Sequence, residues 1–278
     1  MAKNLVKKNE VINENDSNSG IRIQKMLAQI GVGSRREIER AIIEKRISVN
    51  NILAEIGQSV SNKDRIIFDG KLIKLNSDKS SPRILIYNKP EGEIVSESDP
   101  KGRATVFDHL PKIKNAKWIS IGRLDFNTSG LLIFTSYGEF ANRLMHPRYE
   151  IDREYSVRVL GKLTDNQISQ LRVGIKLEDG IARFEKIFLK GGEGSNHWYQ
   201  VILKEGRNRE VRRLFEFFNI IVSRLMRVRF GEIVLPTNLK KGSYIELSKK
   251  EVLKTLSKFN INDTEFNKAQ INKVRNRG

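Results

Sequence analysis

The stretch GRLDFNTSGLLIFTSYGEFANRLMHP, residues 122–147, decides the fold of this chain. Its apolar segment LLIFTS, residues 131–136, predicts a short strand of the buried type. The next residues, 138–145, predict a helix that Pro147 stops. The polar turn of residues 126–130 comes before the strand, and Asp125 stands directly before that turn. The sequence therefore places one carboxylate at the entrance to a buried strand.

Five further segments around this stretch alternate apolar and polar residues, or are apolar throughout, and predict strands. They are RILIYNKP (83–90), WISIGRLD (118–125), EYSVRVLG (154–161), RFEKIFLK (183–190) and WYQVILKEG (198–206). The connections between them are short, and no strand–helix–strand repeat is evident. Residues 83–250 are therefore expected to form one α+β domain with a mainly antiparallel sheet.

Residues 21–75 have a different pattern and predict a small helix-rich domain. Apolar residues recur at helical spacing from Ile23 to Ile30, and Gly31 and Gly33 end that helix. Ser34 is an expected N-cap for a second helix from about Arg35 to Glu44, with Glu37 at the capping-box position. The segments ISVNN (47–51) and RIIFDGKLIKL (65–75) predict strands, the latter around a turn at Asp69-Gly70.

Three segments lack the composition of a folded core. Residues 1–20 are rich in Asn, Lys and Ser and predict a disordered arm. Residues 76–82, NSDKSSP, have the composition of a linker. Residues 251–278 predict a basic tail that begins as a short helix containing Val252, Leu253 and Leu256.

The composition indicates the partner. Lys+Arg number 51 against 33 Asp+Glu, a net charge of +18, which makes nucleic acid the expected partner and a merely solvated basic surface the alternative. The chain has no cysteine, and the dispersed His109, His146 and His197 do not suggest a metal cluster. The sequence shows no signal peptide and no apolar run long enough to span a membrane. We therefore expect a cytoplasmic protein that binds neither a metal ion nor a membrane.

The segment IRIQKMLAQIGVGSRREIERAIIEKRISVNN, residues 21–51, resembles the RNA-binding domain first seen in the fourth small-subunit ribosomal protein, the S-four-like domain. The resemblance implies that the helix pair docks on structured RNA through shape and phosphate contacts. The alternative is an ordinary solvated helix face. The candidate RNA-binding residues of this domain are Arg22, Lys25, Ser34, Arg35, Arg36, Lys45 and Arg46.

Asp125 has two interpretations. A lone Asp before Asn-Thr-Ser-Gly most often caps a turn with its side chain. The run GRLDFNTSGLL, however, resembles the pattern GRLDxxTxGLLxxT of the ribosomal pseudouridine synthases. That resemblance implies that Asp125 is the catalytic residue and that Arg123 helps to displace the target nucleotide. Phe126 stands where an aliphatic or polar residue is more usual in that pattern.

A second match begins at Arg153-Glu154-Tyr155 and resembles the family's (K/R)xY motif, with Arg in place of the commoner Lys. A tyrosine at a strand start is commonly a half-buried packing residue. The resemblance implies instead that Tyr155 stacks on the extruded base, and an aromatic face recovers part of the stacking energy that a flipped uracil loses.

The third match is LKEGRNREVRRLFEFFNIIVSRLMRVRFG, which resembles the family motif EGRNRQVRR. A helix from about 209 to 218 is expected, with Val211, Leu214, Phe215 and Phe218 facing inward. Arginines near a helix N-terminus oppose the helix dipole, so anion binding is the favoured role of Arg207 and Arg209. The resemblance implies that Arg212, or failing it Arg213, pairs with the catalytic aspartate. It also implies that Leu225 packs against the target base.

A weaker match is YNKPEGEIVS, residues 87–96, which resembles the family's opening NKPxGxxxS motif. A strand followed by a tight turn is expected there, as structural support for the site. Lys89 is a candidate RNA contact.

The resemblance implies an α+β enzyme that isomerises uridine to pseudouridine in ribosomal RNA, without a cofactor. The ending GEIVLPTNLKKGSYIELSKKEV resembles members that act on large-subunit RNA. The expected partner is therefore ribosomal RNA, with 23S favoured over 16S, or a pre-ribosomal particle. A monomer is expected. A non-catalytic RNA-binding assembly protein is the alternative, whereas a methyltransferase would need a cofactor loop that the sequence does not show. The sequence leaves open whether Asp125 attacks the ribose, adds to the uracil ring or acts as a base.

Overall fold

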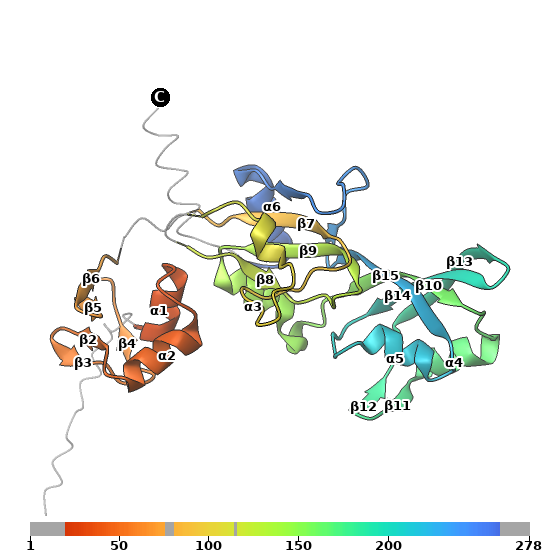
Figure 1. The fold of residues 1–278 in the computed structure, drawn as a ribbon, viewed down its shortest axis with the longest axis horizontal. Helices are drawn as coiled ribbons and strands as arrows, with labels where there is room; N and C mark the ends of the chain where they lie inside the picture. Colours follow the sequence, from red (N-terminus) through yellow and green to blue (C-terminus); the bar gives the residue numbers. More distant parts are fainter. Residues whose placement is uncertain (1–19, 76–80, 114–115, 262–278) are drawn as a thin grey trace, which may run out of the picture. The chain divides into compact units, whose positions relative to one another are not determined.

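The computed structural model describes residues 20–75, 81–113 and 116–261. Backbone contacts divide the chain into two compact units, residues 1–79 and 80–278, shown in Figure 1. Nearly all of the predicted arm and linker, and the end of the predicted tail, lie outside the described residues.

The small unit contains the two predicted helices. Helix α1 spans Ile23–Gln29 and α2 spans Arg35–Ile43. The Glu37 N–H donates to the Ser34 hydroxyl at 3.2 Å, and the Ser34 N–H donates to the Glu37 carboxylate at 2.6 Å. The predicted capping box is therefore confirmed, and it fixes where the second helix begins.

Short strands complete the small unit. Strands β1 (Ile21–Arg22) and β4 (Ser59–Val60) form one antiparallel pair. A four-stranded antiparallel sheet has the order β3 (Ile52–Leu53), β2 (Ile47–Val49), β5 (Ile66–Phe68) and β6 (Lys71–Ile73). The apolar faces of both helices pack on this unit's own core with Ile47, Val49 and Ile66. The small unit thus has an apolar core of its own.

The large unit is built on one nine-stranded sheet. Its main path runs β13 (Lys186–Glu193), β14 (Asn196–Leu203), β10 (Arg153–Leu160), β15 (Ile221–Phe230), β9 (Ser129–Thr135), β7 (Ile84–Lys89) and β17 (Tyr244–Glu246). Strand β8 (Ile119–Ile121) pairs with β9, and β16 (Ile233–Val234) pairs with β15. All of these pairings are antiparallel except β9 with β15, so the predicted α+β fold with a mainly antiparallel sheet is confirmed.

Strands β7 and β9 are buried along their whole length. Ile84 and Ile133 face a core that α3 (Gly138–Met145) and α6 (Lys249–Lys258) cover. Leu85 and Phe134, one residue along each strand, face a second core under the 3-10 helix η1 (Val106–His109). Cores on both faces explain why the central segments are apolar runs rather than alternating ones.

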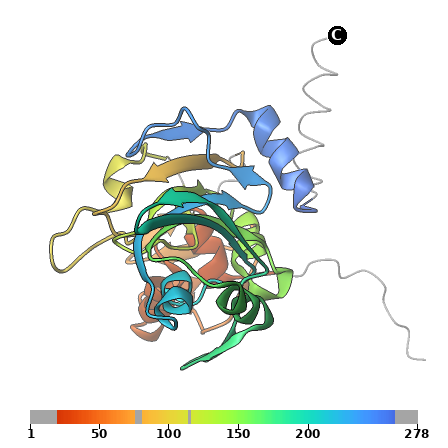
Figure 2. The same cartoon turned by 90° about the vertical axis from the view of Figure 1, so that its right-hand side faces the viewer.

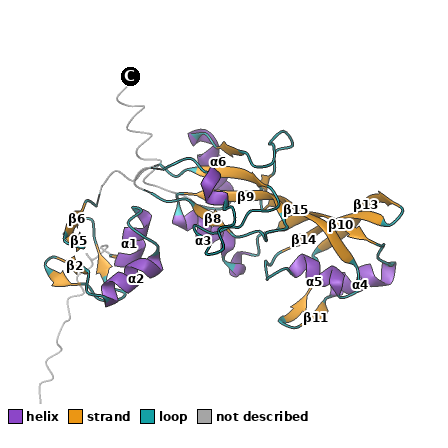
Figure 3. Cartoon of the chain, viewed as in Figure 1, coloured by secondary structure: helices purple, strands orange, loops and turns teal. Residues whose placement is uncertain are grey.

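The other half of the sheet has one main core. Helices α4 (Asp165–Val173) and α5 (Glu210–Glu216) pack on β10, β13, β14 and β15 through Leu171, Leu214 and Phe215. Figure 3 shows both helices, in purple, on the same side of these strands. The remaining elements of this half are the hairpin β11 (Ile175–Leu177) and β12 (Gly180–Ala182). The 3-10 helix η2 (Pro147–Tyr149) follows α3.

The short helix expected at the start of the basic tail is present as α6. Helix α6, blue in Figure 2, starts at Lys249, and its Val252 and Leu256 are buried with Phe259 and Ile261 in the core around α3. The Phe259 carbonyl also accepts a hydrogen bond from Arg143 at 3.1 Å. The apolar face of this helix therefore completes a core of the large unit.

The two halves of the sheet meet where β9 and β15 run parallel, with Gly130 opposite Arg227. Gly130 has φ +99°, and a Cβ there would lie 2.3 Å from the Arg227 carbonyl oxygen. Only glycine permits this approach of the two backbones. The turn that carries Asp125 leads directly into this junction.

Replacing Gly130 with Ala is expected to lower the free energy of unfolding by about 3 kcal/mol or more, because both the backbone conformation and the clash oppose the methyl group. Urea unfolding followed by tryptophan fluorescence measures this, since both tryptophans, Trp118 and Trp198, lie in the large unit.

Gly138→Ala is the matched control. Its Cβ would lie 3.8 Å from Ile119, an ordinary contact, at the start of helix α3. That variant is expected to be neutral or stabilised by up to about 1 kcal/mol. Equal stability of the two variants would contradict the assigned β9–β15 junction.

Candidate active site

The Asp125 side chain projects from a tight turn that the backbone closes. The Thr128 N–H donates to the Asp125 carbonyl at 3.0 Å, and the Gly92 N–H donates to the Phe126 carbonyl at 2.9 Å. Asp125 is half-buried, whereas Leu124 before it and Thr128 after it are buried. The turn therefore anchors its neighbours in the core and leaves the carboxylate at the surface of a cavity.

The buried ammonium group of Lys89 donates hydrogen bonds to the same turn. The Lys89 Nζ donates to the carbonyls of Thr128 at 2.9 Å, Asp125 at 3.2 Å and Pro90 at 2.9 Å. An ammonium has three donors and no acceptor, so it matches three carbonyl oxygens. Lys89 is fully buried, which makes the predicted RNA contact wrong. Its role is to fix the turn on which Asp125 stands.

Arg212, on helix α5, reaches the turn from the other half of the sheet. Its Nη2 donates to the Asn127 carbonyl at 2.8 Å, and its Nη1 donates to the Val222 carbonyl at 2.9 Å. Burial lowers the pKa of Arg212, and the charge of Asp125 partly counters that effect. Within the described residues, the guanidinium contacts the turn's backbone and forms no direct ion pair with the Asp125 carboxylate.

Arg213, the alternative partner for Asp125, lies elsewhere. Its two Nη atoms donate to the Asp179 carboxylate, both at 2.8 Å. The structure therefore brings Arg212, and not Arg213, to the Asp125 turn.

Tyr155 and Leu225 come from the adjacent strands β10 and β15. Tyr155 is half-buried and pairs with Arg227 across the two strands, and Leu225 is only 4% exposed. Both side chains line the cavity that Asp125 faces. An aromatic ring and an aliphatic side chain beside a carboxylate can hold a flat base.

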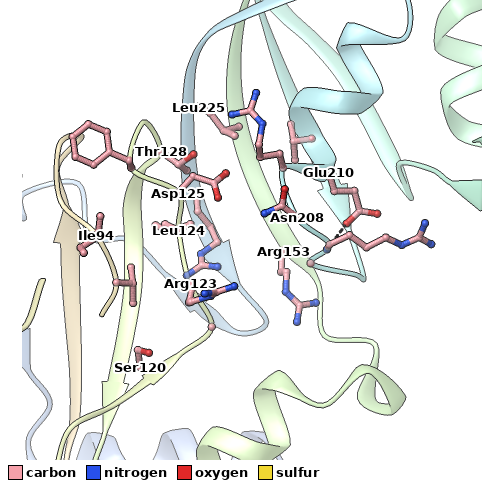
Figure 4. Close-up of a pocket in the computed structure, with 18 of the residues that line it drawn as sticks. Ile94, Ser120, Arg123, Leu124, Asp125, Thr128, Arg153, Asn208, Glu210 and Leu225 are labelled. Atoms are coloured by element: carbon pink, nitrogen blue, oxygen red, sulfur yellow. Dashed lines mark hydrogen bonds between the residues drawn. The ribbon is translucent and has the colours of Figure 1, made fainter. Parts of the chain in front are cut away.

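The cavity has a volume of about 880 Å³. Figure 4 shows Arg123, Leu124 and Asp125 on one wall, and Arg153, Asn208 and Glu210 on the facing wall. Arg123 is exposed, as a side chain that enters the RNA would be. The structure thus brings Arg123, Asp125, Tyr155 and Leu225 to one cavity, while their roles stay predictions.

The arginines around the start of α5 are not free cations. Arg207 lies 2.6 Å from Glu205, and Arg209 lies 3.3 Å from Glu216. Both arginines line the cavity, but acidic partners neutralise part of their charge. Anion binding by Arg207 and Arg209 stays a prediction, and these ion pairs lower the charge that is available for it.

Sequence reasoning missed three cavity residues. Arg153 is held by the carbonyls of Ile151 and Lys204, at 2.9 and 2.7 Å. Glu210 is 5% exposed, and burial raises its pKa. Arg227 is 2% exposed on β15. The alternation in LMRVRF could have placed Arg227 on the inward face with Leu225.

All seven candidate RNA-binding residues of the small unit are exposed. They are Arg22, Lys25, Ser34, Arg35, Arg36, Lys45 and Arg46. Three of these have structural contacts. Arg22 donates to the Gly57 carbonyl, and Ser34 caps α2. Arg46 pairs with Asp69 and Glu44 at 2.5 and 2.9 Å. Lys25, Arg35, Arg36 and Lys45 therefore fit the prediction better.

The described parts of the chain show neither a metal site nor a membrane-spanning helix. No group of three or more His, Cys, Asp or Glu side chains there is arranged to hold a metal ion. No helix there is long and apolar enough to cross a membrane.

Lys89 gives the site a pH-dependent stability. Burial lowers its pKa from 10.5 to about 8, so between these values the unfolded chain binds more protons than the folded chain. The contribution of Lys89 to stability therefore rises with pH across this window. The Lys89→Met variant lacks this pH-dependent contribution. The unfolding free energy of wild type minus that of the variant is therefore expected to increase from about pH 7 to about pH 10.

Urea unfolding at several pH values measures this gap. Lys176→Met, at an exposed position of β11, is the control and is expected to follow wild type at each pH. A gap between wild type and Lys89→Met that is constant with pH would contradict the assignment.

The chain was compared with known families and proteins. Residues 83–217 match the RNA pseudouridylate synthase family, and residues 21–66 match the S4 domain. The chain is 53% identical over 235 residues to the ribosomal large subunit pseudouridine synthase B of Pseudomonas aeruginosa, covering 84% of this chain and 61% of that protein. The enzyme of the same name from Yersinia pestis is 52% identical over 234 residues, covering 83% of this chain and 74% of that protein.

A solved structure described as a crystal structure of pseudouridylate synthase has the same fold, with a TM-score of 0.58 and 25% identity. The match covers 84% of this chain and 99% of that one. The expected S-four-like domain and the expected synthase domain are both confirmed. The chain belongs to the RNA pseudouridine synthase family, with an S4 domain ahead of its synthase domain.

Proposed function

We propose that this protein converts a uridine of large-subunit, 23S ribosomal RNA to pseudouridine, with Asp125 as the catalytic residue. One observation carries the proposal: Lys89 and Arg212 hold the carbonyls of the Asp125 turn, and the turn faces a cavity lined by Tyr155 and Leu225. The names of the relatives and the ending of residues 231–252 support the large-subunit target.

The reaction breaks the bond between ribose C1′ and uracil N1, turns the base and joins C1′ to C5. A proton leaves C5 and a proton is gained at N1, so atoms balance without an oxidant or reductant. Asp125 acts on the ribose or the base, Tyr155 stacks on the flipped uracil, and Leu225 packs against its edge. The cavity walls hold the flipped uracil away from the stacked RNA bases while the uracil rotates.

The RNA is held by both units. Lys25, Arg35, Arg36 and Lys45 of the small unit are exposed cations suited to phosphate contacts, so affinity is expected to fall with salt. Arg123, exposed beside Asp125, fills the place of the flipped nucleotide. A monomer that acts in the cytoplasm on ribosomal RNA or a pre-ribosomal particle belongs to the same proposal.

Two other functions make different predictions. A small-subunit, 16S target would leave the same site chemistry in place and move the modified uridine to the other RNA. A non-catalytic assembly protein would use the basic surface alone and would not need the Asp125 carboxylate. The cavity around Asp125 favours the enzyme.

Asp125→Asn is expected to lower the rate of pseudouridine formation by at least about 1000-fold, because the amide cannot act as a nucleophile or base. RNA affinity should stay near the wild-type value, since the phosphate contacts are unchanged. Release of tritium from RNA labelled at uracil C5 measures the rate, and filter binding measures the affinity.

Asp165→Asn, at an exposed position of α4 outside the cavity, is the control and should react like wild type. Pseudouridine formed by Asp125→Asn at the wild-type rate would exclude Asp125 as the catalytic residue. Reaction of the wild-type protein with 16S but not 23S RNA would identify the alternative target.

Tyr155→Leu is expected to slow the reaction about 10- to 100-fold, because a stacked base loses roughly 1–3 kcal/mol with its aromatic partner. Tyr155→Phe keeps the ring and should retain more of the rate than Tyr155→Leu. Single-turnover rates on the same RNA compare the three proteins. A Tyr155→Leu protein as fast as wild type would show that the ring does not hold the base.

A further inference from the structure

Arg227 is a buried arginine that the proposed function does not use. Its side chain is 2% exposed on strand β15, and it lines the cavity. The Nε atom donates to the Leu131 carbonyl at 2.8 Å, and the guanidinium carbon lies 5.0 Å from the centre of the Phe230 ring. These contacts fix the guanidinium in one place.

The charge of Arg227 has no acidic partner among the described residues. Burial lowers its pKa, and the Tyr155 side chain counters that effect through its charge and through a hydrogen bond. Arg229, two residues along the same strand, shows the usual arrangement, with Glu154 at 2.5 Å and Asp152 at 3.6 Å. An unpaired buried cation costs several kcal/mol. An acceptor supplied by a ligand would offset that cost.

One donor of Arg227 is available for such an acceptor. Its Nη2 atom is buried and has no hydrogen-bond partner in the described structure. A buried donor without a partner is uncommon in proteins and commonly marks a functional site. Arg227 pairs with Tyr155 across two strands and follows Leu225 by two residues, so all three side chains lie along one stretch of the cavity wall.

We propose that Arg227 is a substrate-binding residue that donates a hydrogen bond from Nη2 to an acceptor oxygen of the target nucleotide. This inference rests on the proposed function, because Tyr155 and Leu225 place the target uridine beside Arg227. A guanidinium has only donors, so it binds a uracil carbonyl oxygen or a phosphate oxygen.

Arg227→Lys and Arg227→Met test the proposal in the full chain. Each is expected to lower the single-turnover rate about 10- to 100-fold, the effect of one hydrogen bond to a charged donor, with RNA affinity nearly unchanged. A lysine keeps the charge but lacks the planar forked guanidinium, whose Nε and Nη2 donate from two separate, fixed positions. Arg224→Met is the control, because Arg224 is exposed on the same strand and does not line the cavity.

An RNA with a methylphosphonate at the target nucleotide identifies the acceptor. If Arg227 binds the phosphate, this RNA slows wild type and slows Arg227→Lys no further. If it binds a uracil carbonyl, the two penalties multiply. Penalties that multiply exclude the phosphate as the acceptor, and neither result needs the methionine variant to fold.

Two results would overturn the inference. The first is a folded Arg227→Lys protein that reacts as fast as wild type. The second is a slow Arg227→Lys protein whose penalty disappears in a Tyr155→Leu background, since Arg227 would then act only by placing Tyr155. A wild-type protein that forms no pseudouridine would instead overturn the proposed function.

Discussion

The hydrogen bonds that the buried Lys89 ammonium donates are the constraint on which the site depends. They collect the carbonyls of Pro90, Asp125 and Thr128 around one charge at the end of strand β7. Without that charge, the carbonyl oxygens of Pro90 and Thr128 would lose this donor, at about 1–3 kcal/mol for each one left buried and unpaired. The position of the Asp125 carboxylate therefore follows from a lysine 36 residues earlier in the chain.

The site lies where the two halves of the sheet meet. Lys89 belongs to the half that α3 and α6 cover, whereas Arg212 belongs to the half that α4 and α5 cover. Both hold carbonyls of the Asp125 turn, and Gly130 lets β9 approach β15 directly after it. A shift between the two halves would move Asp125 relative to Tyr155 and Leu225. The packing of the whole large unit thus sets the geometry of the cavity.

Local patterns were sufficient for most of the fold. The capping box at Ser34 and Glu37, the proline after α3 and the apolar run of β9 each act within a few residues, so the sequence predicted those elements correctly. The sequence did not show that α6 packs into the large unit. The apolar face of α6 has a partner only in the core around Phe140, far away in the sequence.

The site was predicted less completely, for the same physical reason. The motifs predicted that Asp125, Tyr155 and Leu225 belong to one site, and all three line one cavity in the structure. They could not show that Lys89 is buried or that Arg212 holds backbone carbonyls rather than the carboxylate. Contacts between distant segments neutralise Arg213 with Asp179, place Lys89 under a turn and leave Arg227 with a free donor.

The most direct test of the central claim is a map of pseudouridines in ribosomal RNA from cells with and without this protein. The account predicts that one or a few pseudouridines in 23S RNA disappear when the protein is absent and return when the wild-type protein is restored. An unchanged map in both ribosomal RNAs would contradict it.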